Sequence, residues 1–224
     1  MKKKLAFIHT SPVLVPMFTQ LAAELLPGTQ IFHMVDESLI KNTIAAGSLT
    51  AANARRVFRL IESAQEAGAD AALVTCSSIG KAVEFSRPLI DIPVMRVDEP
   101  MAAAAIAKGQ RIGVAATLRT TLAPTLQLLE DTARREQRSV ELVPCLCEGA
   151  FEALLSGNTE RHDQLLLDAL QQLVDTVDVV VLAQASMARV VAGLSANGTT
   201  ILSSPRLAVE NARELLLQLH PVEV

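Results

Sequence analysis

The feature that most constrains the fold of this chain is a repeat of its first half in its second half. Segment 4–10 matches segment 111–117 at an offset of 107 residues. Segments 69–76 and 92–96 match segments 177–184 and 200–204, each at an offset of 108 residues. Three apolar segments in the same order at a nearly constant offset indicate two similarly folded halves.

The matched segments contain short apolar runs that are typical of buried strands. In the first half we predict strands at residues 5–8, 30–35, 71–74 and 92–97, and helices through Met17, Leu21 and Leu25, over 49–67 and from Gly80. Alternating strands and helices require a parallel sheet with right-handed crossovers. We therefore expect an α/β fold of two similar Rossmann-like lobes, with mainly parallel sheets, a pseudo-twofold relation and an active-site cleft between the lobes.

The lobe boundaries follow from the repeat and from the last helical pattern. A chain of 224 residues is long enough for one large α/β domain or two small ones, and the repeat favours two. The helix predicted over 207–219 has no following strand in its own lobe. We therefore predict that residues 1–97 with 210–224 form the first lobe and residues 98–209 the second.

Composition favours a small ligand over a macromolecular partner. The net charge is −4, and Trp and Tyr are absent, so basic patches and stacking platforms for nucleic acid are not expected. No run of 18 apolar residues predicts a membrane span, and the apolar run that ends before His9 is too short for a signal peptide. We expect no nucleic acid and no membrane partner, and homo-oligomer formation is left open.

The three cysteines argue against a metal site and against a disulfide framework. Cys145 and Cys147 have one residue between them, which is not a metal-ligand spacing, and an odd count leaves one thiol unpaired. This usage predicts a reducing, cytoplasmic location and no metal site.

Cys76, Ser77 and Ser78 stand where a predicted strand turns into a predicted helix. The carboxyl ends of parallel strands and the N–H groups of the following helices meet at one sheet edge, where ligands bind. A thiol and two hydroxyls at that edge predict a site for an anionic substrate. The repeat places Gln184 at the position equivalent to Cys76.

Polar turns after other strands are candidates for the same site. The turn after the first strand contains His9, Thr10 and Ser11. The second half offers a further set after its own strands, namely Thr117, Thr120, Thr121, Gln184 and Ser186. Ser and Thr at these positions are also ordinary helix caps, and the same N-terminal amides can hold a carboxylate.

The chain resembles the aspartate/glutamate/hydantoin racemase superfamily over nearly its whole length. The resemblance rests on segments 74–78, 35–37, 96–98, 111–117 with 120–124, and 179–187. It implies a two-lobed fold in which cysteines flank the substrate. One thiolate removes the α-proton and a second thiol returns it on the opposite face, without a cofactor. Relatives with altered cysteine sets include arylmalonate decarboxylases and maleate isomerases.

This chain departs from that pattern at Gln184, which stands at the position of the second cysteine. A glutamine amide has no accessible pKa and cannot serve as an acid or a base. We therefore expect an isomerase or lyase that acts at the carbon next to a carboxylate, with Cys76 as catalytic thiolate or proton donor and Gln184 as a hydrogen-bond donor. The alternatives are an amino-acid racemase whose second base is His9 or a carboxylate, and a non-catalytic protein that binds small carboxylates.

Each candidate also has a purely structural interpretation. Cys76 as a buried structural thiol is the alternative to a thiolate stabilised by a helix N-terminus, which we favour and which predicts that Cys76 alkylates before Cys145 and Cys147. Cys145 and Cys147 are expected to be structural, after a strand over 140–143. His9 is as well explained by a satisfied strand-end histidine.

The charged residues near the predicted strand ends have the same two interpretations. They are the acids Asp36, Glu37, Asp98 and Glu99, and one base, Arg206, which is placed near the equivalent turn of the second lobe. We expect Glu37 and Glu99 to be solvated turn residues or acids at helix N-termini. Arg206 is a candidate partner for a substrate carboxylate.

Overall fold

In the computed structural model, which describes residues 2–193 and 198–219, the chain divides into two compact units. Unit 1 takes the chain up to Val97 and resumes at Pro205, and unit 2 runs from Asp98 to Ser204. The boundary predicted near residue 210 therefore lies at residue 205, because one unbroken helix, α9, spans this point. Residues 220–224 of the predicted first lobe lie outside the described residues.

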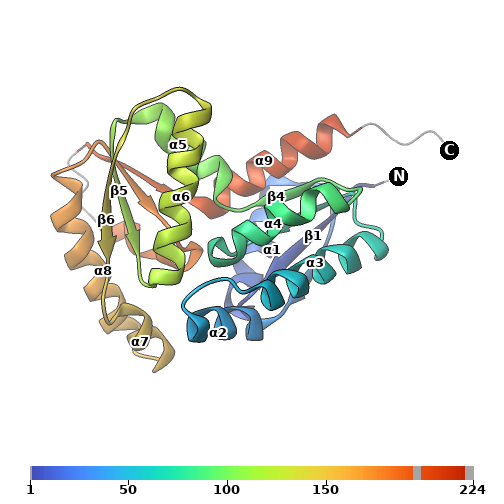
Figure 1. Ribbon diagram of the computed structural model, residues 1–224, viewed down its shortest axis with the longest axis horizontal. Coiled ribbons are helices and arrows are strands. Elements are labelled where there is room, and N and C mark those ends of the chain that lie inside the picture. The colour runs from blue at the N-terminus through green and yellow to red at the C-terminus, as the bar shows by residue number, and fades with distance from the viewer. Residues whose placement is uncertain (1, 194–197, 220–224) are drawn as a thin grey trace. The chain divides into compact units, whose positions relative to one another are not determined.

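Unit 1 is a four-stranded parallel sheet, sheet A, with the strand order β2-β1-β3-β4. Figure 1 shows its helices around the sheet. Its elements are β1 (Lys4–His9), η1 (Pro12–Leu14), α1 (Val15–Leu25), β2 (Gln30–Val35), α2 (Glu37–Ala46), α3 (Ala51–Glu66), β3 (Ala71–Val74), η2 (Ser77–Ile79), α4 (Gly80–Ser86), η3 (Arg87–Leu89), β4 (Val94–Arg96) and α9 (Ser204–Gln218).

Successive side chains of β1 point to opposite faces of the sheet, and each face is covered by a buried apolar cluster. Ala6 and Ile8 belong to a buried cluster with residues of α3 and α4, including Val57 and Val83. Phe7 points the other way and packs against Phe18 of α1, with ring centroids 5.4 Å apart. Since every residue from Leu5 to Ile8 is fully buried, both faces of this strand are covered, as is usual for a parallel sheet.

Unit 2 repeats the architecture with a second parallel sheet, sheet B, in the order β6-β5-β7-β8. Its elements are α5 (Glu99–Lys108), β5 (Arg111–Ala116), α6 (Arg119–Arg135), β6 (Glu141–Leu146), α7 (Ala150–Leu155), α8 (Thr159–Val174), β7 (Val179–Leu182), η4 (Ala185–Gly193) and β8 (Thr200–Ser203). A buried cluster joins β5 and β7 to α8 through Ala115, Val180, Leu166 and Leu170.

The strand registers confirm the repeat at the level of single residues. Ile8 lies opposite Val74 in unit 1, and Ala115 lies opposite Leu182 in unit 2, which reproduces the offsets of 107 and 108. The third match is wrong by one residue. Ala72 pairs with Val94, whereas its equivalent Val180 pairs with Ile201, so the offset of the fourth strand is 107.

A carboxylate ties the first strand to the third at the same place in both units. Asp70 accepts a hydrogen bond from the N–H of Lys4 at 2.7 Å. Its equivalent Asp178 accepts from the N–H of Gln110 and of Arg111, at 2.9 and 2.8 Å. These bonds satisfy backbone donors at the amino ends of β1 and β5, which would otherwise have no partner in the ladder.

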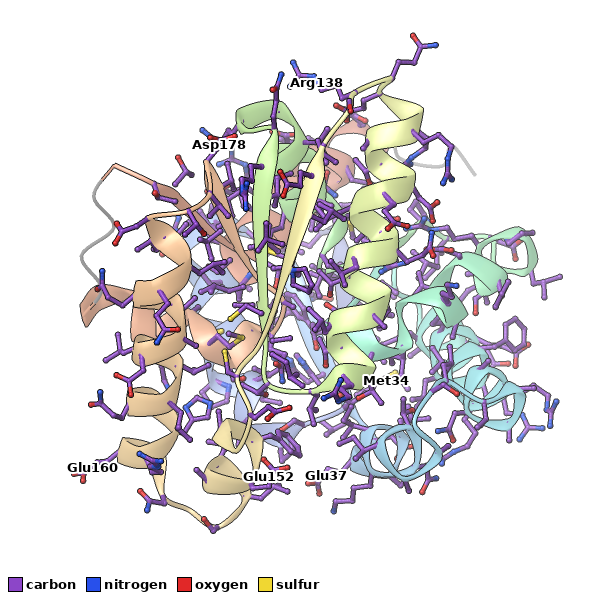
Figure 2. The ribbon with its side chains drawn as sticks, turned by 60° about the vertical axis from the view of Figure 1, so that its left-hand side comes forward. Met34, Glu37, Arg138, Glu152, Glu160 and Asp178 are labelled. Atoms are coloured by element: carbon purple, nitrogen blue, oxygen red, sulfur yellow. The ribbon has the colours of Figure 1, made fainter. Side chains whose placement is uncertain are left out.

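Figure 2 distinguishes the two ends of sheet B by its labelled side chains. Asp178 and Arg138 lie toward the end where the strands begin, and Glu152 and Glu160, on α7 and α8, lie toward the end where they finish. The carboxyl edge of this sheet is therefore flanked by α7 and by the first turns of α8.

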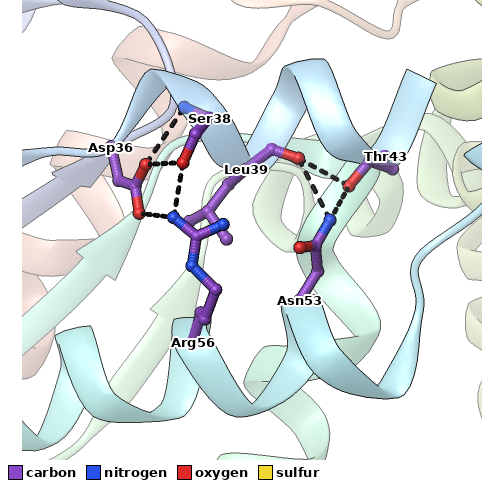
Figure 3. A network of polar contacts seen from close by, with 6 residues as sticks. All are labelled: Asp36, Ser38, Leu39, Thr43, Asn53 and Arg56. Carbon is purple, nitrogen blue, oxygen red and sulfur yellow. Dashed lines mark hydrogen bonds and ion pairs between the residues drawn. The ribbon is translucent and has the colours of Figure 1, made fainter. Parts of the chain in front are cut away.

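No helix was predicted over the residues of α2, because the stretch after β2 begins with the polar residues Asp36, Glu37 and Ser38 and was expected to be a loop. Asp36 caps this helix by accepting the N–H of Ser38 at 3.0 Å, and it also pairs with Arg56 of α3. Figure 3 shows this contact and a second one, in which Asn53 donates to Thr43 at 3.1 Å. The polar segment is helical because side chains of α3 form hydrogen bonds and an ion pair with its polar groups.

Two strand boundaries also differ from the prediction. Strand β6 extends to Leu146, so Cys145 lies within the strand and not after it. Strand β4 is limited to Val94–Arg96, within the predicted range 92–97. Pro144 sits within β6, which is tolerated because β6 is an edge strand of sheet B.

We predict that Phe18→Ala destabilises the protein and Phe85→Ala does not. Phe18 is fully buried against Phe7, whereas Phe85 is 67% exposed. The expected loss of unfolding free energy is about 3–5 kcal/mol for Phe18→Ala and within about 0.5 kcal/mol for Phe85→Ala. Urea denaturation followed by circular dichroism measures both values, and equal losses would contradict the described core.

Candidate active site

The carboxyl edge of each sheet collects the polar residues that the sequence singled out. Cys76 is the second residue after β3, and Gln184 is the second residue after β7. Since β3 lies beside β1 and β7 lies beside β5, Thr10 and Thr117 follow the neighbouring strand in each unit. The two units therefore present the same pair of positions, a threonine beside residue 76 or 184.

Cys76 is half-buried at the start of η2 and packs against the apolar cluster of α3 and α4. Burial raises the pKa of its thiol, which outweighs hydrogen bonding from the Thr10 hydroxyl, the N–H groups of Ser78 and Ile79, and the Ser78 hydroxyl. Burial therefore opposes the thiolate that was expected from the helix N-terminus, and the pKa of this thiol lies above its ordinary value. The amides act in the predicted direction, but desolvation of the charged form dominates.

Gln184 is oriented by Thr117. Its Oε1 accepts the Thr117 N–H at 2.6 Å and the Thr117 hydroxyl at 2.9 Å. Both groups of Thr117 donate, so the atom that they contact must be the amide oxygen of Gln184. The amide nitrogen, Nε2, therefore points away from Thr117. Both acceptor positions of Oε1 are thus occupied, and Nε2 carries the donors of this side chain. Thr117 itself is buried, which fixes this arrangement.

Three further hydroxyl candidates lie in the turns around these two positions. Ser77 and Ser78 are buried in η2, directly after Cys76, and Ser186 is half-buried at the start of η4, two residues after Gln184.

The remaining hydroxyl candidates lie after the first strand of each unit. Ser11 is half-buried at the start of η1, and its side chain makes no capping bond there. Thr121 is buried in the first turn of α6, after β5. The structure brings all of these hydroxyls to the carboxyl edges of their own sheets.

Unsatisfied polar atoms gather along the carboxyl edge of sheet B. Among the described residues, three buried side-chain atoms have no hydrogen-bond partner: Thr120 Oγ1, His162 Nε2 and Ser204 Oγ. Thr120 follows β5, Ser204 follows β8, and His162 lies in the first turns of α8. Buried polar groups without partners are rare, so each of these three atoms stands out among the described residues.

His162 is a residue that the sequence analysis missed. Its Nδ1 lies 2.8 Å from Asp163 Oδ1, and Arg189 of η4 donates to the same carboxylate at 2.6 and 2.9 Å. Arg189 Nη2 also lies 3.3 Å from the same Nδ1. When a neutral His162 donates from Nδ1 to Asp163, its unpartnered Nε2 is an acceptor. The only sequence signal was a histidine beside an aspartate at the start of a helical pattern.

Arg96 was also missed. It is 3% exposed, lies at the carboxyl end of β4 and pairs with Glu84 of α4. A Cβ on Gly80 would lie 2.4 Å from the Arg96 Cζ atom. The absence of a side chain at Gly80 therefore lets the guanidinium pack against the first turn of α4, next to the Cys76 turn.

Both ring nitrogens of His9 are engaged within unit 1. Nδ1 lies 2.8 Å from Thr75 Oγ1, and Nε2 lies 2.9 Å from Nδ1 of His33. The far nitrogen of His33 lies 3.0 Å from Thr19 Oγ1. Burial and the neighbouring His33 lower the pKa of His9 to about 4, so the ring is neutral at pH 7.

The proton positions in this chain of contacts are constrained. Both threonine hydroxyls lie within reach of backbone carbonyls, those of Ile8 and Val15. If both donated there, the two facing histidine nitrogens would share no proton. In a neutral pair, one hydroxyl therefore turns its proton to the imidazole.

The acidic candidates have structural partners. Asp36 caps α2, and Glu37 lies in the first turn of the same helix, 3.9 Å from Lys41. Asp98 is fully buried at the start of α5, and Glu99 is in its first turn. Glu37 and Glu99 therefore each lie in the first turn of a helix, where the helix dipole favours an acid.

Arg206 was predicted near the equivalent turn of the second lobe. It lies instead on α9 in unit 1, 2.6 Å from Glu24 and 3.7 Å from Glu210. Its guanidinium therefore has two carboxylate partners within its own unit.

The other two cysteines form a coupled pair. A hydrogen bond from the Cys147 thiol lowers the pKa of Cys145 to about 7, whereas that contact and burial raise the pKa of Cys147. No group of three or more His, Cys, Asp or Glu side chains in residues 2–193 and 198–219 is arranged to hold a metal. Within the same described ranges, no helix has the length and hydropathy of a membrane span.

The chain is similar to known proteins in sequence pattern and in fold. A family model described as Asp/Glu/Hydantoin racemase matches residues 9–212. No curated protein sequence gives a significant match.

Solved structures share the fold at low sequence identity. Glutamate racemase from Francisella tularensis in complex with D-glutamate is 13% identical, with a TM-score of 0.75, covering 97% of this chain and 81% of that one. Aspartate racemase from Picrophilus torridus is 12% identical, with a TM-score of 0.73 and coverage of 95% and 94%. Allantoin racemase from Klebsiella pneumoniae is 17% identical, with a TM-score of 0.66 and coverage of 96% and 88%.

We predict that His9 makes the protein less stable as the pH falls from about 6.5 to about 4. The folded pKa of about 4 lies below the ordinary histidine pKa of 6.5, so the unfolded chain binds the proton first in this window. His9→Gln should reduce the dependence of the unfolding free energy on pH there, by up to about 3 kcal/mol across the window. Denaturation curves at several pH values measure it, and parallel curves for the two proteins would contradict it.

We predict that Cys145 alkylates before Cys76 near pH 7.5, the reverse of the order expected from sequence. A pKa of about 7 leaves much of Cys145 ionised at this pH, whereas burial keeps Cys76 protonated. Mass spectrometry after brief iodoacetamide treatment measures the order. The Cys76 rate should rise only at higher pH, and faster labelling of Cys76 at pH 7.5 would show that the helix amides prevail.

Proposed function

Because this chain belongs to the Asp/Glu/Hydantoin racemase family, we propose that it is a cofactor-independent isomerase or lyase that acts at the carbon next to a carboxylate. The observation that carries the proposal is the equivalence of Cys76 beside Thr10 and Gln184 beside Thr117. One position offers a thiol that exchanges a proton, and the other offers an amide that cannot. The proposed reaction therefore uses a single cysteine.

In this proposal Cys76 delivers the proton. A raised pKa keeps the thiol protonated at neutral pH, which is the state that a proton donor needs. The thiolate formed by the transfer is then stabilised by the Thr10 and Ser78 hydroxyls and by the amides of Ser78 and Ile79. These groups do not ionise the free thiol, but they lower the activation free energy of proton transfer from it.

Gln184 is proposed to bind the substrate and not to carry a proton. Thr117 fixes the amide so that Nε2 is available as a donor. An N–H donor stabilises a carboxylate, and also the enolate that forms when its α-carbon loses a group. The hydroxyl of Thr120, the hydroxyl of Ser204 and Nε2 of His162 lie along the same sheet edge without partners. These atoms support a ligand with several polar groups.

A small carboxylate is the proposed substrate class. The relatives whose structures share the fold are described as acting on glutamate, aspartate and allantoin. These compounds, together with malonate and maleate, form the first panel for a thermal-shift screen. A ligand at 100 times its Kd is expected to stabilise the protein by about 2.7 kcal/mol. Stabilisation without turnover would favour the alternative of a carboxylate-binding protein.

The rival enzymatic proposal is an amino-acid racemase with a second base other than cysteine. His9 was the candidate from the sequence. Its two ring nitrogens already contact Thr75 and His33, and its lowered pKa makes it a weak base. These contacts favour a role for His9 in positioning the ends of β1 and β3.

We predict that turnover in heavy water leaves deuterium on one face of the substrate carbon. Only Cys76 is proposed to transfer the proton, because an amide replaces the second acid. Cys76→Ser should lower the rate by about 100-fold or more, whereas Gln184→Ala should raise KM more than it lowers kcat.

Proton nuclear magnetic resonance of the isolated products measures the stereochemistry. Phe85→Ala is the control, since this side chain is 67% exposed. Equal exchange of both enantiomers by the wild type and by Gln184→Ala would establish another second base and refute the single-cysteine mechanism.

A further inference from the structure

Cys145 and Cys147 have no role in the reaction proposed for Cys76, but their positions allow the two thiols to react with each other. Both side chains face the same buried cluster, because Cys147 is a member of it and Cys145 and Val143 pack against it. Alternation along β6 accounts for this, since residues two apart point to one face of a strand. The two thiols are within hydrogen-bonding reach of each other.

The two cysteines differ in access. Cys145 is half-buried, whereas Cys147 is 3% exposed beneath α8. An oxidant therefore reaches Cys145 first, and Cys147 remains as a reduced thiol next to the product. This is the arrangement of a reacting cysteine and a resolving cysteine.

We propose that Cys145 and Cys147 form an oxidisable thiol pair that a hydroperoxide converts to an intramolecular disulfide. In the first step the Cys145 sulfur attacks one peroxide oxygen, the O–O bond breaks, and a sulfenic acid and hydroxide form. In the second step the Cys147 sulfur attacks the sulfenic sulfur. The S–O bond breaks, the S–S bond forms, and the Cys147 proton leaves with the oxygen as water.

The protein provides the conditions for both steps. The lowered pKa of Cys145 supplies the thiolate that the first step requires. Cys147 is the first residue after β6, and the Glu148 N–H donates to the Leu146 carbonyl at 3.0 Å, so the chain leaves the extended conformation at Cys147. A disulfide needs Cβ atoms about 3.5–4.5 Å apart, which is closer than residues two apart in a straight strand, so bridging requires this turn to tighten. The bond is therefore strained, and a strained disulfide is readily reduced by thiols. The edge position of β6 and its Pro144 leave room for the strand to bend.

Disulfide formation at this place would act on the carboxyl edge of sheet B. The N–H of Cys147 donates to the Ala116 carbonyl at 2.8 Å. The next residue, Thr117, holds the Gln184 amide through its own N–H and hydroxyl. A bend in β6 at Cys147 therefore pulls on the strand end that orients Gln184. This coupling requires only the described contacts within unit 2 and holds whether or not the proposed enzymatic function is correct.

The test is treatment of the full-length protein with a small excess of hydrogen peroxide, then alkylation, trypsin digestion without reductant and mass spectrometry. Trypsin releases both cysteines in one peptide, residues 139–161, and Cys76 in another, residues 60–81. We expect peptide 139–161 to be lighter by two hydrogens and to carry no alkyl group. Dithiothreitol should reverse this change. Most of peptide 60–81 should remain unoxidised and should be alkylated after unfolding.

Variants identify the order of the two steps. In Cys147→Ser, dimedone should trap the sulfenic acid at Cys145. In Cys145→Ser, Cys147 should stay unlabelled, and in the control Cys76→Ser the disulfide should form as in the wild type. Oxidation of Cys76 first, or oxidation of Cys145 to sulfinic acid with no disulfide in the wild type, would overturn the proposal. The wild-type measurement decides even if a variant fails to fold.

Discussion

The arrangement of both candidate edges depends on one constraint, the pairing of the first strand with the third in a parallel sheet. Parallel register brings the carboxyl ends of the two strands side by side, so the residues that follow them must meet. Ile8 opposite Val74 and Ala115 opposite Leu182 fix this in the two units. The contacts between Thr10 and Cys76 and between Thr117 and Gln184 follow from this geometry. A threonine serves both because it can donate to a sulfur and to an amide oxygen.

Strand positions and the repeat were predictable because buried parallel strands are nearly uniform apolar runs. The offset of the fourth strand was wrong by one because a short apolar segment matches equally well in two registers, and only the ladder selects one. Helix α2 was missed for a different reason. Its polar first turn is stabilised by Asp36 and by Arg56, which is distant in sequence, and a local pattern carries no signal for such a partner.

The site was predictable in position and less so in electrostatics. A strand followed by Cys76 and two serines fixes where the thiol lies, but its pKa depends on how much water the folded chain removes. Four groups favour the thiolate at Cys76, and burial still dominates. His162 and Arg96 could not be identified from their neighbours in sequence. The acceptor on His162 results from Asp163 taking the other nitrogen, and the position of Arg96 results from the missing side chain at Gly80.

The three thiols of this chain differ in reactivity because their environments differ. Burial raises the pKa of Cys76 and keeps this thiol protonated, and a protonated thiol reacts slowly with oxidants. Cys145 has the opposite balance, because its neighbour Cys147 donates a hydrogen bond to the thiolate. An oxidant that enters unit 2 is therefore consumed by the pair before it reaches a protonated thiol elsewhere. The connection from Cys147 through Ala116 to Thr117 then transmits that event to Gln184 by one backbone hydrogen bond and one peptide unit.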